Sequence, residues 1–175
     1  MNIVFINLHK INLLLVPYEQ IKSGWAVKTY KHKYFLDYLL AHNVQVYNFI
    51  LCDEKDKEKE VEKAEYVYQY NGYEKGAITN IFEEDIHKID EKDILIAYFH
   101  YFHGYRAAKM FNCKRVLMGN HCFRVKEGQY LGLKEDGFSA FVNEVDLSKN
   151  EFVNHFYKLT DVKMLTVPFI YADRF

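Results

Sequence analysis

Residues 93–123 read DILIAYFHYFHGYRAAKMFNCKRVLMGNHCF, and this stretch decides the fold. A strand is predicted at 93–98, where the apolar run ILIAY is too short for a helix, a helical segment follows at about 104–111, and a second strand, with the apolar run VLM, is predicted at 114–118. This order is typical of a parallel strand–helix–strand unit whose strands are buried on both faces of a sheet. We therefore predict two parallel strands joined by a helix.

The rest of the chain repeats this alternation. The mixed-charge run 53–63 is expected to be an exposed helical turn or a loop, because it has almost nothing to bury. Strands separated by helices, without consecutive hairpins, predict the α/β class, with a doubly wound, mostly parallel sheet and helices on both faces. We predict further strands at 2–8, 44–51, 66–70, 138–142 and 164–167, helices at 25–41, 78–89 and 146–159, a loop at 9–24, and a loop or a small hairpin at 124–137.

Composition limits the class of protein. The 175 residues suffice for one domain with a proper core, and not for two domains of ordinary size. With 23 basic and 24 acidic residues the net charge is −1, so no nucleic-acid partner is expected. Cys52, Cys113 and Cys122 form no Cys-x-x-Cys pair, which argues against a disulfide framework and favours a reducing cytoplasm. No apolar run reaches 18 residues, and no signal peptide precedes the first strand.

Histidines follow both strands of 93–123. His100 and His103 come after the first strand, and Asn120 and His121 come after the second. Ligands of open parallel sheets bind outside the carboxyl ends of the strands, so we expect both loops to line a site. A zinc site built from the histidines and Cys122 is disfavoured, because carboxylates and a fixed ligand spacing are absent, and no metal is expected.

These motifs resemble a known family when the tail is added to them. A strand ending in histidines (ILIAYFHYFH), a helix, a strand ending in a polar residue plus His (RVLMGNHCF), and a last strand followed by a proline (LTVPFIYADRF) occur in this order. The succession resembles the N-terminal, acceptor-side domain of retaining glycosyltransferases of the GT-B fold, similar to glycosyltransferase family 4. The resemblance implies that residues 1–175 form a single Rossmann-like domain, one half of a GT-B enzyme. A C-terminal nucleotide-sugar-binding domain would follow Phe175 and is absent from this sequence.

The resemblance also implies a reaction. A hexosyltransferase-like enzyme would move a sugar from a nucleotide-sugar donor to a glycan or lipid-linked acceptor in cell-surface polysaccharide synthesis. This domain would bind the acceptor, need no cofactor of its own and be inactive alone, since the donor would bind mainly the second domain. His121 is placed like the family's active-site histidine and is the expected catalytic residue. The expected substrate-binding residues are Ser23, Gly24 and Trp25, at a helix N-terminus suited to an anionic group, together with His100, His103, Arg106 and Asn120.

Basic residues near the first predicted helix suggest a membrane contact. Lys22, Lys28, Lys31 and Lys33 lie among aromatic residues. Such surfaces are attracted to anionic headgroups by about 1 kcal/mol per basic residue. The predicted location is the cytoplasm, with peripheral contact at the inner membrane face. The competing interpretation of these lysines is a solvated helix face.

Other classes of protein were weighed against the transferase. A non-catalytic Rossmann-like binding or interaction module, complete at 175 residues, is the second hypothesis. A dinucleotide oxidoreductase is disfavoured because no Gly-x-Gly-x-x-Gly follows the first strand. A response regulator is disfavoured because that strand ends in Asn7-Leu8-His9 and not in clustered acids.

Overall fold

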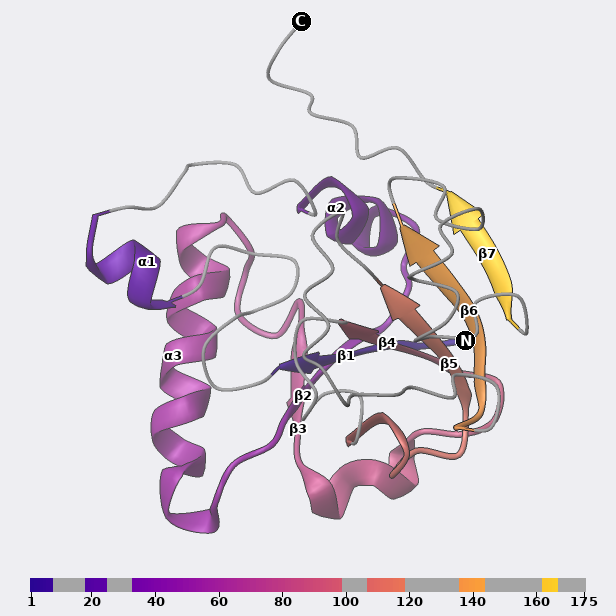
Figure 1. Cartoon of the computed structure of the whole chain (residues 1–175). Helices are drawn as coiled ribbons and strands as arrows, with labels where there is room; N and C mark the ends of the chain where they lie inside the picture. The colour runs from indigo at the N-terminus through magenta and orange to yellow at the C-terminus, as the bar shows by residue number, and fades with distance from the viewer. Residues whose placement is uncertain (8–17, 25–32, 99–106, 119–135, 144–161, 167–175) are drawn as a thin grey trace, which may run out of the picture.

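A computed structural model of the chain describes residues 1–7, 18–24, 33–98, 107–118, 136–143 and 162–166. Within these residues, seven strands form one sheet in the order β3-β2-β1-β4-β5-β6-β7 (Figure 1). Every neighbouring pair is parallel. The strands are β1 (Ile3–Asn7), β2 (Val46–Ile50), β3 (Thr79–Ile81), β4 (Ile94–Tyr98), β5 (Lys114–Met118), β6 (Phe138–Asn143) and β7 (Lys163–Thr166). The predicted α/β class, with a Rossmann-like parallel sheet, is confirmed.

The first strand lies inside the sheet. Ile3 of β1 is in register with Val46 of β2 on one side and with Ile94 of β4 on the other. The chain therefore builds the sheet outward in one direction through β2 and β3, and then in the other direction from β4 to β7 (Figure 1). The border between β1 and β4 is the point at which the strand order reverses, as in doubly wound folds.

Successive residues of the strands fill two different cores. Val4, Phe49 and Leu95 belong to one buried cluster, which is covered by a 3₁₀-helix, η2 (Glu83–Lys88), and by residues 107–111. The neighbouring strand residues, among them Ile3 and Ile96, belong to a second cluster. Since side chains alternate across a strand, these clusters lie on opposite faces of the sheet. Three helices supply the second cluster: α1 (Tyr18–Lys22), α2 (Lys33–Ala41) and α3 (Lys57–Tyr70).

A buried carboxylate ties the amino ends of the central strands together. Asp93 is 2% exposed and directly precedes β4. Its Oδ1 accepts a hydrogen bond of 2.7 Å from the backbone N–H of Asn2, and its Oδ2 accepts one of 3.0 Å from that of Asp90. The carbonyl of Asp93 also accepts a bond from the N–H of Lys114, the first residue of β5. One residue thus connects the starts of three neighbouring strands.

Two predicted elements are wrong. Residues 66–70 were expected to form a strand, but they are the last turn of α3, and the charged run before them forms a 3₁₀-turn, η1 (Glu54–Asp56), and the start of α3. Residues 78–89 were expected to form one helix, but they contain the edge strand β3 and η2. Helix α1 also lies within the loop expected at 9–24.

The remaining predicted elements agree with the structure or fall outside it. Strands predicted at 2–8, 44–51, 93–98, 114–118, 138–142 and 164–167 are confirmed to within two residues at each end. Of the helix expected at 25–41, only α2 is described. The helix predicted at 146–159 and nearly all of the loop at 124–137 lie outside the described residues.

Candidate functional site

The predicted site residues follow the strands β4 and β5 and the helix α1 in the sequence. The strands that precede the two histidine loops are adjacent, and Tyr98 at the end of β4 is in register with Met118 at the end of β5. The two strand ends are therefore neighbours on one edge of the sheet. Six predicted site residues lie outside the described residues: Trp25, His100, His103, Arg106, Asn120 and His121.

The other two, Ser23 and Gly24, end a helix. The N–H of Ser23 donates to the carbonyl of Glu19 at 3.0 Å, and the N–H of Gly24 donates to that of Ile21 at 3.2 Å. The hydroxyl of Ser23 donates to the carbonyl of Gln20 at 3.0 Å. These donors thus stabilise the last turn of α1, and a role of Ser23 or Gly24 in substrate binding stays a prediction.

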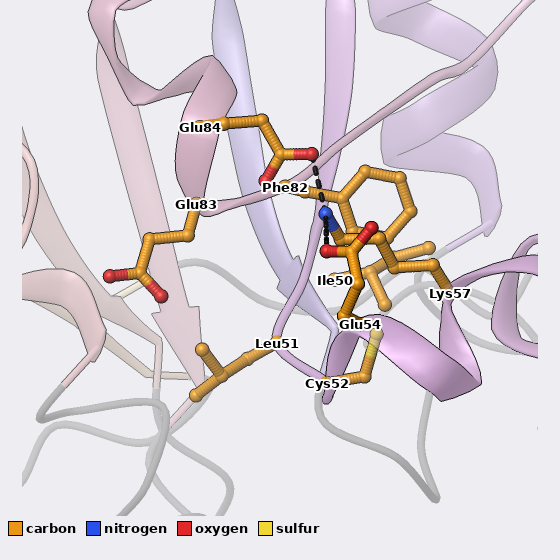
Figure 2. A pocket seen from close by; sticks show the side chains of 8 residues that line it. All are labelled: Ile50, Leu51, Cys52, Glu54, Lys57, Phe82, Glu83 and Glu84. Carbon is orange, nitrogen blue, oxygen red and sulfur yellow. Dashed lines mark hydrogen bonds and ion pairs between the residues drawn. The ribbon is translucent and has the colours of Figure 1, made fainter.

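A cavity of about 170 Å³ lies at the carboxyl ends of β2 and β3 (Figure 2). Its apolar part comes from the last residue of β2, the residue that follows, and the phenyl ring after β3. Its charged part comes from η1, η2 and the first residue of α3. The lining side chains are Ile50, Leu51, Cys52, Glu54, Lys57, Phe82, Glu83 and Glu84.

Lys57 joins the two sides of this cavity. Its Nζ lies 2.5 Å from a carboxylate oxygen of Glu54 and 2.6 Å from one of Glu84. The same Nζ lies 5.1 Å from the centre of the Phe82 ring, within the range of a cation–π contact. The hydrogen bond to Glu54, followed by that to Glu84, raises the pKa of Lys57. The hydrogen bond from Lys57 in turn lowers the pKa of Glu84, so both groups are charged at neutral pH.

Glu83 is the lining carboxylate without a counter-charge among the described residues. Figure 2 shows its side chain directed away from the Lys57 cluster. Three glutamates and one lysine give the lining a formal charge of −2. The lining therefore combines apolar side chains with a net negative charge.

Cys52 contributes a neutral group. Burial raises the pKa of its thiol, and the nearby carboxylates of Glu60 and Asp56 raise it further. The thiolate is the nucleophilic form of cysteine, so this residue is poorly suited to covalent chemistry at neutral pH.

The described part of the chain contains neither a metal-ligand cluster nor a membrane-spanning helix. It contains no group of three or more His, Cys, Asp or Glu side chains that could hold a metal ion. It also has no helix with the length and apolar character needed to cross a bilayer.

The predicted membrane-binding lysines lie in different surroundings. The Nζ of Lys22 is 4.3 Å from the centre of the Tyr66 ring and 5.5 Å from that of Tyr18. The Nζ of Lys33 is held by Asp37 at 2.9 Å, which offsets its charge. Lys28 and Lys31 lie outside the described residues, and membrane contact stays a prediction.

The cavity was not among the sites predicted from sequence. The rule that pointed to the ends of β4 and β5 also applies to the end of β2, where Cys52 is followed by Asp53 and Glu54. The lining residues that follow β3, which are Phe82, Glu83 and Glu84, could not be found in this way. Residues 78–89 were expected to form a helix, and this concealed the end of β3 at Ile81.

The comparisons with known proteins give one match. A family model described as YopX protein matches residues 24–133, which is more than half of the chain. No curated protein and no solved structure matches the chain significantly.

The family match corrects the functional prediction. The matched family is not a glycosyltransferase family. The resemblance to a GT-B acceptor domain is therefore wrong, together with the hexosyltransferase-like activity and the role in polysaccharide synthesis. The expected donor, acceptor and second domain after Phe175 depended on the resemblance to a glycosyltransferase, so they no longer have support from it. The alternative of a non-catalytic module gains no specific support from the match.

Proposed function

Since the chain belongs to the YopX protein family, whose description names neither a reaction nor a ligand, we propose a function from the geometry of the cavity: the domain binds a small organic molecule at the carboxyl ends of β2 and β3. A parallel α/β sheet supports many functions, so the residues of the site and not the fold indicate what this domain binds. The observation that carries it is the cavity itself, at the edge where ligands of such sheets bind.

The size of the cavity limits the ligand. An apolar cavity of about 150 Å³ holds benzene, so the 170 Å³ here admits one group of ring size. Ile50 and Leu51 offer apolar contacts for the body of such a group. The carboxylate of Glu83, an exposed residue of the lining, offers a hydrogen-bond acceptor.

The charge of the cavity limits the ligand further. The lining carries three carboxylates against one ammonium, and that ammonium already pairs with two of them. Phosphates and carboxylates would enter against this charge, so the ligand group is neutral or cationic.

Binding of ring-sized fragments tests the proposal. A fragment of about six non-hydrogen atoms should bind with a Kd on the order of 1 mM, which NMR titration can measure. Leu51→Trp should abolish binding because the indole fills the cavity. Tyr70→Trp is the matched control, since Tyr70 is 42% exposed near the end of α3 and does not line the cavity. Equal binding by Leu51→Trp and the control, or no binding of any neutral or cationic fragment by the unmodified protein, would overturn the proposal.

A further inference from the structure

The cavity lining points to the chemical class of its ligand. We infer that the group that enters it is an ammonium carried on a small hydrocarbon body, and that the ammonium pairs with Glu83. This inference rests on the proposed function, because it specifies the ligand of the same cavity.

The first support is the unequal charge of the lining. Lys57 is the cationic residue of the lining, and its Nζ lies between Glu54 and Glu84. Glu83 is exposed, no described residue pairs with it, and Figure 2 shows its carboxylate directed away from that cluster. A ligand that supplies one positive charge there would reduce the formal charge of the lining from −2 to −1.

The second support is the way in which the cavity already holds an ammonium. The Nζ of Lys57 lies over the Phe82 ring, at 5.1 Å from its centre, and contacts two carboxylates. Aromatic faces and carboxylates are the groups that recognise organic ammonium ions. The side chain of Lys57 thus shows that one side of the lining, formed by Glu54, Glu84 and Phe82, stabilises an ammonium, and the ligand would place a second ammonium on the other side, at Glu83.

The apolar contacts distinguish an organic cation from a metal ion. Metal sites of hard cations are built from several oxygen ligands, and the described residues contain no group of three potential ligands. Ile50, Leu51 and Phe82 instead form a surface that a hydrocarbon can cover. A hydrated metal ion would gain nothing from that surface, whereas an alkylammonium would use both it and the carboxylate.

Three ligands of nearly equal shape test the inference: cyclopentylamine, cyclopentanol and cyclopentanecarboxylate. NMR titration of the full chain at low salt should give a Kd for the amine roughly two- to fivefold lower than for the alcohol, which is the range of an exposed ion pair. The carboxylate should bind most weakly. Raising the salt to 1 M should remove most of the preference for the amine, because the Debye length falls to about 3 Å.

Two variants assign the effect to one residue. Glu83→Gln should bring the Kd of the amine to that of the alcohol and leave the Kd of the alcohol unchanged. Glu58→Gln should leave the preference intact, since Glu58 is an exposed acid of α3 that does not line the cavity. If amine and alcohol bind equally to the unmodified protein, the ammonium inference is wrong while the binding function stands. If Glu83→Gln keeps the full preference, the assigned partner is wrong, and if none of the three ligands binds, the proposed function itself fails.

Discussion

Replacing Asp93 by alanine should lower the free energy of unfolding substantially, and more than the same replacement of the neighbouring Asp90. The substitution removes the acceptor for two backbone N–H groups, that of Asn2 next to the start of β1 and that of Asp90 in the turn before β4. A hydrogen bond to a charged group contributes about 1.5–3 kcal/mol. Both bonds are only partly buried, so water can replace part of each. We expect a loss of about 3 kcal/mol in the free energy of unfolding, near the lower end of the summed range.

Urea denaturation followed by circular dichroism measures this loss. For a protein of this size, about 3 kcal/mol corresponds to a decrease in Tm of about 6–12 °C. Asp90→Ala is the matched control, since the Asp90 side chain accepts one exposed bond, from the N–H of Lys92 at 2.7 Å. It should cost no more than about 0.5 kcal/mol. Asp93→Asn should fall between the two variants, because its amide oxygen accepts one bond while its NH₂ group faces the other donor. If Asp93→Ala lies within about 0.5 kcal/mol of the unmodified protein, the carboxylate does not tie the strands together.

Three further predictions use other parts of the structure. Burial raises the pKa of Cys113 from 9.0 to about 11, so the thiol of the unfolded chain ionises first, and the free energy of unfolding should fall as the pH rises from 9 to 11. Cys113→Ala should reduce this fall. An unchanged dependence of the free energy of unfolding on pH in the variant would contradict the prediction. Gly72 and Gly137 both have positive φ, but an added Cβ would meet a guanidinium nitrogen at 3.1 Å only at Gly137. Gly72→Ala should thus cost about 1–2 kcal/mol in urea denaturation and Gly137→Ala more, whereas equal costs would show that the contact is harmless. Anionic liposomes should float the protein at low salt, with Lys22→Glu weakening flotation more than Lys33→Glu, and no flotation of the unmodified protein would exclude the membrane.

The central strands could be predicted because burial leaves a strong signal in their residues. In β4, Leu95 and Ile96 are buried on opposite faces, and β5 ends in an apolar run that includes the buried Leu117, so both strands leave short apolar runs in the sequence. The same reasoning located β1, β2 and β6, whereas β7 was predicted although it has no buried residue. Strand order was not contained in the runs themselves. The alternation of strands and helices indicated parallel pairing, and the handedness of such connections limits the possible orders.

The wrong elements show where periodicity is ambiguous. Tyr66, Tyr68 and Tyr70 alternate, which indicated a strand, but they continue a helix whose buried residues Ala64, Val67 and Tyr68 follow the helical spacing. The helical spacing becomes visible only when these tyrosines are taken together with the charged segment before them, which forms the first part of α3.

The second wrong element failed for a different reason. Ile78, Ile81, Phe82, Ile86 and Ile89 have the spacing of an amphipathic helix. Residues 79–81 instead pair with β2, a long-range contact that overrides local preference. The candidate site was missed for the same reason. Glu83 and Glu84 can be placed at the carboxyl end of a strand only if residues 79–81 are recognised as β3. Its charge and volume depend on how η1 and η2 approach each other, and no local pattern encodes that approach.

The interior position of β1 has a consequence for how the protein is made. Ile3 of β1 pairs with Val46 and with Ile94, so one of its neighbours is synthesised 91 residues after it. At 5–20 residues per second, the ribosome needs roughly 5–18 s to produce that neighbour. During this interval β1 can pair with β2 and be covered by α3, while its other edge stays available to incorrect partners. We therefore expect folding on the ribosome to proceed in two stages, with β1, β2 and β3 assembling first and β4 closing the open edge of β1 when it emerges.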